Sequence, residues 1–167
     1  LAVVSTYNQI EYGIYTNKDY GNVRGLELKL DYSLDNLFIQ TNYTYQFTRG
    51  NADNPSQTFS RQGSSIDKVI RFIPMSWDQR HTFNVSLGYN TSKYGITSTG
   101  YYNSGTPYTF SPQGESNLAL LNLYPNNDYK PSNYTIDLTG YLNLPKIFGY
   151  QPNLNLLMRN ITDRRNE

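Results

Sequence analysis

The single histidine of the chain, His81, is the first residue whose chemistry could support catalysis. Asp78 precedes it closely, and a Ser-His-Asp triad needs a histidine base that is oriented by a carboxylate. No nucleophile-elbow sequence accompanies this pair, and the chain has no cysteine to act as another nucleophile. A histidine without the other members of a triad does not make a catalytic site, and we expect that the chain is not an enzyme.

The aspartates are the next candidates, because carboxylates in loops can bind metal ions. Asp31, Asp35 and Asp53, or Asp67 and Asp78, do not have the fixed spacing of an oxygen-rich calcium loop. There is also no glycine-rich loop that would hold phosphate groups. Charged side chains usually stay in solvent, so we expect exposed loop carboxylates, no metal site and no cofactor.

The composition excludes one class of partner and disfavours an ordinary soluble domain. The net charge is only +1 and the basic residues are scattered, which argues against nucleic-acid binding. Hydrophobic residues make up 37% of the chain and charged residues 16%, against roughly 25% charged residues in soluble proteins. An outer-membrane β-barrel tolerates this composition, because its polar side chains line a wet interior and its apolar ones face lipid.

The elements that must position these residues are strands, because hydrophobic residues recur with a period of two. Leu26, Leu28 and Leu30 alternate with Glu27 and Lys29, which is typical of a strand with one buried face. Similar alternation, supported by aromatic and threonine content, predicts further strands at 39–48, 82–90, 94–102, 134–143 and 153–162, and two remnants of an earlier hairpin at 2–7 and 10–15. The register of 94–102 stays open, because its glycines blur the alternation.

Short and long connections alternate between these strands. The connections at 34–36, 91–93 and 145–152 are short, whereas those at 49–76 and 104–132 are long and polar. Long irregular loops are uncommon in compact soluble domains. Short turns on one side and long extracellular loops on the other are typical of outer-membrane barrels. We therefore predict an all-β fold, an antiparallel transmembrane β-barrel fragment in which 49–76 and 104–132 are extracellular loops.

Binding is the chemistry that remains, and junctions between strands and long loops are where it would occur. Trp77, Arg80, Tyr102 and Tyr108 lie at such junctions, where rings and a guanidinium could contact a solute. The alternative is that these aromatic residues belong to an interfacial girdle and brace the loops. Both interpretations stay open.

Four segments resemble the barrels of TonB-dependent outer-membrane receptors. They are Asn22–Leu28, similar to an "RGxE" strand opening, Trp77–Asn84, similar to "DQRH", Tyr102–Tyr108, similar to "SGxPYT", and Met158–Asn166, similar to "xNLTDxRN". Each motif is weak alone, but the four occur in the order of the family and cover most of the chain.

The resemblance implies late strands of a barrel of about 22 strands, incomplete here at both ends, since ~8 strands is the smallest membrane barrel. It implies active import of a scarce solute into a Gram-negative cell, energised by TonB through a plug domain outside this chain. Outer-membrane lipid and a surface lipoprotein would be further partners. A passive porin or structural outer-membrane barrel is the alternative, and a secreted β-sandwich adhesin is a third possibility. The solute is not predicted.

Overall fold

The computed structural model describes residues 2–7, 10–15, 20–53, 71–110 and 125–165 of the chain. These residues form strands, turns and bends, and the expected all-β class with antiparallel pairing is confirmed. Among them, no helix is long and apolar enough to cross a membrane.

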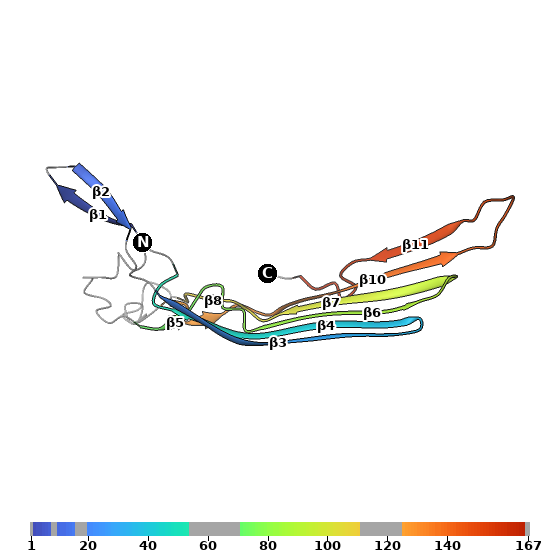
Figure 1. Cartoon of the computed structure of the whole chain (residues 1–167), viewed down its shortest axis with the longest axis horizontal. Helices are drawn as coiled ribbons and strands as arrows, with labels where there is room; N and C mark the ends of the chain where they lie inside the picture. The colour runs from blue at the N-terminus through green and yellow to red at the C-terminus, as the bar shows by residue number, and fades with distance from the viewer. Residues whose placement is uncertain (1, 8–9, 16–19, 54–70, 111–124, 166–167) are drawn as a thin grey trace. The chain divides into compact units, whose positions relative to one another are not determined.

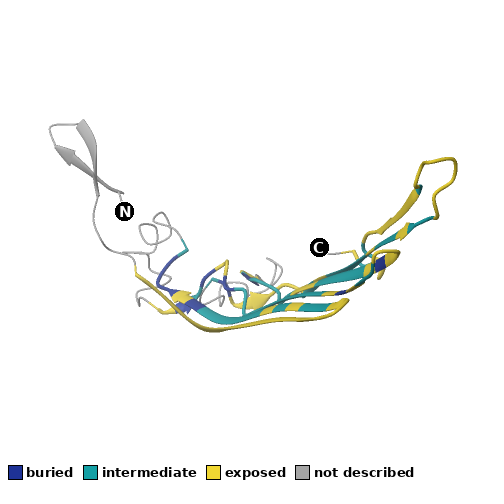
Figure 2. Cartoon of the chain, turned by 45° about the vertical axis from the view of Figure 1, so that its right-hand side comes forward, coloured by how far each residue is buried: buried dark blue, intermediate teal, exposed yellow. Residues whose placement is uncertain are grey.

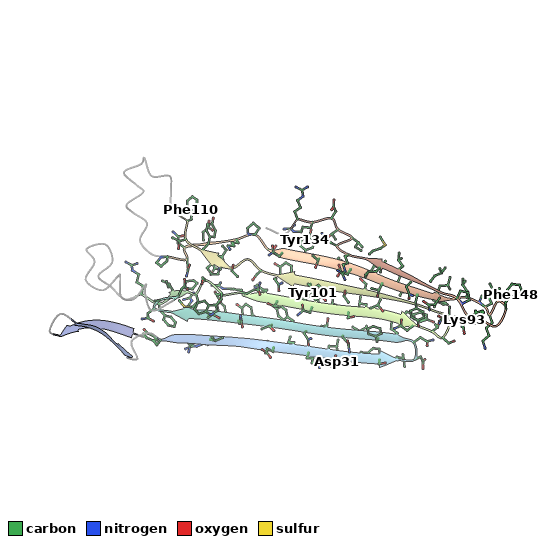
Figure 3. All side chains as sticks on the ribbon, turned by 90° about the horizontal axis from the view of Figure 1, so that it is seen from above. Asp31, Lys93, Tyr101, Phe110, Tyr134 and Phe148 are labelled. Atoms are coloured by element: carbon green, nitrogen blue, oxygen red, sulfur yellow. The ribbon has the colours of Figure 1, made fainter. Side chains whose placement is uncertain are left out.

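The larger sheet has the order β11-β10-β7-β6-β4-β3, and β5 pairs with the end of β4. Figure 1 labels these strands, and Figure 3 shows those of the larger sheet side by side. Two smaller sheets pair β1 with β2 and β8 with β9. The strands are β1 (Ala2–Tyr7), β2 (Ile10–Tyr15), β3 (Gly21–Leu34), β4 (Leu37–Gly50), β5 (Ile73–Pro74), β6 (His81–Asn90), β7 (Tyr94–Asn103), β8 (Pro107–Tyr108), β9 (Asp128–Tyr129), β10 (Asn133–Asn143) and β11 (Asn153–Met158).

The predicted strands correspond to β1–β4, β6, β7, β10 and β11. β3 and β4 are longer than the predicted segments, and β11 is shorter. β11 ends at Met158, although the alternation suggested a strand to about Thr162. Asn160 and Asp163 take left-handed φ angles of 50° and 49°, which interrupt an extended chain. The backbone N–H of Asn160 is donated to the Asp137 carboxylate at 2.7 Å, so the irregular segment is held against β10.

The chain divides into two compact units, which we describe separately. The loop unit contains residues 1–24, 46–79 and 106–130, and the sheet unit contains residues 25–45, 80–105 and 131–167. β3 and β4 each contribute residues to both units. The described ends of the two long connections, 49–76 and 104–132, lie mostly in the loop unit, where they form β5, β8 and β9. Residues 54–70 and 111–124 of these connections lie outside the described residues.

The loop unit is held by a small core that is largely polar. Ala52, Ile73 and Met75 are the buried hydrophobic residues in the described part of the chain. Asp78 is completely buried beside them, and its carboxylate accepts the Thr48 N–H at 2.6 Å.

The expectation of exposed loop carboxylates is therefore wrong for Asp78. The physical reason is that the Thr48 N–H lies on β4 between the residues that pair with β6 and those that pair with β5, where a buried N–H needs an acceptor and a short carboxylate can supply one. Asp53 is also partly buried, and it accepts the Ser76 N–H and the Asn126 side-chain amide, each at 2.7 Å. Asp31 and Asp35 are exposed as expected. Asp67 lies outside the described residues.

Candidate functional site

The register of the larger sheet aligns apolar side chains across neighbouring strands. Directly opposed residues of antiparallel strands project to the same face. Ile39 pairs with Leu87, and Leu138 pairs with Met158. Carrying this pairing from β4 to β11 gives an apolar face made of Leu37, Ile39, Thr41, Tyr43, Tyr45, His81, Phe83, Val85, Leu87, Tyr89, Tyr94, Ile96, Ser98, Gly100, Tyr102, Tyr134, Ile136, Leu138, Gly140, Leu142, Leu154, Leu156 and Met158.

The opposite face of the same strands is polar and almost uncharged. Representative pairs are Asn42 with Asn84 and Thr99 with Asp137. Asp137 is the one ionisable carboxylate or base on this face between β4 and β11, and it accepts the Asn160 N–H. The polar face consists of Phe38, Gln40, Asn42, Thr44, Thr82, Asn84, Ser86, Gly88, Asn90, Gly95, Thr97, Thr99, Tyr101, Asn103, Asn133, Thr135, Asp137, Thr139, Tyr141, Asn143, Asn153, Asn155 and Leu157.

β3 extends the same two faces to the edge of the sheet. Its leucines, such as Leu28 and Leu30, alternate with Glu27, Lys29 and Asp31. Lys29 and Asp31 form an ion pair of 2.9 Å, but both side chains are at least half exposed, so the pair contributes little stability. Lys29 and Asp31 are two residues apart on β3, so both charges of the ion pair project to one face of this strand.

The apolar face is not covered by any described segment of the sheet unit. Ile96 is 50% exposed and Leu156 is 53% exposed, and the three buried hydrophobic residues of the described chain all belong to the loop unit. Figure 2 shows the strands of the sheet mainly in the exposed and intermediate colours. Soluble monomers rarely leave continuous apolar patches larger than a few hundred Å² in water. This face therefore requires an apolar environment that the described chain does not supply.

Two aromatic rings lie over glycines on the polar face. A Cβ atom added to Gly88 would overlap the ring of Phe38, its cross-strand partner, and would come within 2.8 Å of Phe38 Cδ1. A Cβ atom added to Gly95 would overlap the ring of Tyr141 in the same way, coming within 2.7 Å of Tyr141 Cζ. These glycines are required because the rings occupy the space above them.

A groove lies beside one of these rings, over β6, β7, β10 and β11. Its volume is about 620 Å³, and Asn90, Thr97, Thr139, Tyr141 and Asn155 are among the residues that line it. The Tyr141 hydroxyl donates to the Thr91 carbonyl at 2.6 Å, which fixes the ring at the edge of the groove. Sequence reasoning missed this site, because the ring sits on the polar face and its glycine partner is on another strand.

His81 belongs to an aromatic cluster at one end of the apolar face. Its Nδ1 is hydrogen-bonded to the Tyr43 hydroxyl at 2.8 Å, and its ring lies 5.0 Å from that of Tyr45, centroid to centroid. Its backbone N–H is donated to the Ser104 hydroxyl at 3.0 Å. These contacts fix where the strand begins and supply no carboxylate of the kind that a triad requires.

The four residues predicted to bind a solute are divided between the units. Trp77 and Tyr108 belong to the loop unit, and Arg80 and Tyr102 belong to the sheet unit. Trp77 is 54% exposed, and Tyr102 lies on the apolar face opposite Tyr134. Their role in binding stays a prediction.

Tyr108 has a defined partner across the β8–β9 pair. Its hydroxyl donates to the Asp128 carboxylate at 3.0 Å. This hydrogen bond, with desolvation and the negative charge of Asp128, raises the pKa of the Tyr108 phenol. The bond joins the described ends of the second long connection, so Tyr108 has a structural role whether or not it contacts a solute.

Within the described residues, no group of three or more acidic, histidine or cysteine side chains is arranged to hold a metal ion. No protein-family profile, curated protein or solved structure matches this chain.

Proposed function

We propose that this chain forms part of the wall of an outer-membrane β-barrel that imports a solute by TonB-dependent transport. The observation that supports the proposal is the register, which gathers apolar side chains on one face of the sheet and polar ones on the other. A barrel wall is one sheet thick, meets hydrocarbon on its outer face and water on its inner face, and needs this arrangement.

The height of the apolar face fits a membrane. On β10 it runs from Tyr134 to Leu142, which is about 27 Å along a strand at ~3.4 Å per residue. A strand tilted by about 40° then covers roughly 21 Å of depth, close to the ~25 Å apolar band of outer-membrane barrels.

Aromatic side chains occur at both ends of this band, where headgroups would lie. Tyr43 and Tyr134 are near one end, and Tyr89 and Tyr94 are near the other, with ring centroids 6.1 Å apart. Amphipathic rings favour the membrane–water interface. Two girdles flanking one apolar band support a transmembrane orientation over a face buried in a soluble sandwich.

Active transport rests on the motifs, which resemble those of TonB-dependent receptors. In this mechanism the loops and a plug capture the solute, and TonB shifts the plug to open a path along the polar wall. Residues such as Gln40, Asn42, Asn84 and Thr135 would then offer hydrogen bonds to the solute without strong charge. A surface lipoprotein would act as a lid over the loops.

The test has two steps that separate location from energy coupling. In the first, the intact protein is followed through separation of the bacterial membranes, and we expect it in the outer membrane, extractable by detergent and retained in high salt. Recovery in the soluble fraction would refute the barrel. In the second, solute uptake is measured with and without TonB. Uptake that persists without TonB would leave the barrel but replace active transport with passive diffusion.

A further inference from the structure

We propose that the groove beside Tyr141 binds an uncharged, polyhydroxylated solute of the carbohydrate type. This inference rests on the proposed function, because it takes the polar face of the sheet as the surface that the solute passes. The groove belongs entirely to the sheet unit and uses side chains from four neighbouring strands. Its position is fixed by strand pairing and not by loops.

The first reason is the aromatic surface. The Tyr141 ring lies over Gly95, is held there by the hydrogen bond to Thr91, and lines the groove. The C–H face of a sugar ring packs on aromatic rings, and rings already held in place lose little entropy when a ligand binds.

The second reason is the set of hydrogen-bonding groups around the ring. Asn90 and Asn155 offer amide donors and acceptors, and Thr97 and Thr139 offer hydroxyl groups. Amides and hydroxyls both donate and accept, which matches the vicinal hydroxyls of a sugar. The Thr139 hydroxyl also donates to the Thr97 carbonyl at 3.4 Å, which leaves its oxygen as an acceptor, and Leu157 adds apolar surface for the C–H groups of a sugar.

The third reason is the absence of charge. No ionisable acid or base lines the groove apart from the phenol of Tyr141, which is already donating to Thr91. A carboxylate or phosphate ligand would lose its hydration shell here without meeting a counter-charge, which is costly. The groove volume of about 620 Å³ falls within the ~300–1,000 Å³ typical of small-molecule sites.

The experiment measures binding by isothermal titration calorimetry on the intact protein in detergent micelles. The probes are maltohexaose, cellohexaose and xylohexaose, with hexagalacturonate as a charged counterpart. We expect at least one neutral probe to bind more tightly than hexagalacturonate by tenfold or more. Tyr141→Ala should weaken that binding at least tenfold and Thr97→Val about threefold, while Ser86→Ala, on the same face but outside the groove, should leave it unchanged.

The inference is overturned if no neutral probe binds, if hexagalacturonate binds equally well, or if Tyr141→Ala and Ser86→Ala weaken binding to the same extent. Thermal unfolding of each variant shows whether it is folded, and Asn155→Ala, which removes an amide of the groove, replaces Tyr141→Ala if the latter does not fold. Membrane fractionation of the wild-type protein is the independent control for the proposed function. Outer-membrane location without probe binding would refute the groove alone, whereas a soluble protein would refute the barrel.

Discussion

Arginine substitutions at two consecutive positions of β10 test the two faces of the sheet. Leu138 lies at the centre of the apolar face, midway between Tyr134 and Leu142, and Thr139 projects to the polar face. Leu138→Arg places a guanidinium in the middle of the proposed hydrocarbon layer, whereas Thr139→Arg places the same group in water. The two variants share strand, neighbourhood and side chain, and they differ only in the face that receives the charge.

The expected loss of stability depends on how deep in the membrane the arginine lies. An arginine at the midplane of a membrane barrel costs ~2–4 kcal/mol, and near the interface it costs ~0–1 kcal/mol. Leu142 is four residues from Leu138, or about 14 Å along the strand and roughly 10 Å in depth at a tilt of ~40°. We therefore expect Leu138→Arg to lower the folding equilibrium constant ~30- to 1,000-fold, Leu142→Arg by less than about tenfold, and Thr139→Arg hardly at all.

The assay is a guanidinium titration of the intact protein in phosphatidylcholine vesicles, followed by far-ultraviolet circular dichroism. A graded loss that peaks at Leu138 indicates a membrane profile. Equal losses for Leu138→Arg and Thr139→Arg, or a loss at Leu142 as large as at Leu138, would refute the membrane-facing assignment.

Two further predictions concern contacts that the sequence did not reveal. Gly88→Ala should destabilise the protein by ~1–3 kcal/mol in the same titration, because the added methyl group displaces the Phe38 ring. The control is Gly100→Ala, whose Cβ would meet only Val85 Cγ1 at 3.1 Å and which should destabilise the protein less. Equal losses of stability would contradict the contact between Phe38 and Gly88. Asp128→Asn should lower the raised pKa of the Tyr108 phenol, which is measured by phenolate absorbance. The wild-type hydrogen bond is present below the usual phenol pKa and is lost as the pH rises through the raised value. An unchanged titration would refute the pairing.

The strands could be predicted from the sequence because alternation is a local property. Leu26 to Ser33 alternates without a break, and the predicted strand there lies inside β3. The bounds predicted for the first hairpin, 2–7 and 10–15, match those of β1 and β2. The predicted strand 153–162 is longer than β11, because the alternation in the sequence does not indicate that Asn160 adopts a left-handed conformation.

The candidate site could not be predicted, because its contacts join residues far apart in the chain. Tyr141 lies on the polar side of β10, and its contact with Gly95 depends on how β10 pairs with β7. In the sequence, Gly95 only blurs an alternation, whereas in the sheet it makes room for a ring. Burial of Asp78 has the same origin, since the Thr48 N–H that it accepts lies 30 residues away.

The two-faced character of the sheet depends on register more than on composition. A slip of one residue between β6 and β7 would move Tyr94, Ile96 and Tyr102 to the polar face. Hydrogen bonds at both ends of the β6–β7 hairpin oppose such a slip. At the turn, the Thr91 hydroxyl donates to the Tyr94 carbonyl at 2.7 Å and accepts the Tyr94 N–H at 3.0 Å.

At the other end, the Ser104 N–H is donated to the His81 carbonyl at 2.8 Å, and the His81 N–H is donated to the Ser104 hydroxyl. The His81 backbone therefore helps to fix which side chains of β6 and β7 share a face. Because such a reciprocal pair would be broken by a slip, the sheet keeps its polar and apolar sides apart even though glycines weaken the alternation within β7.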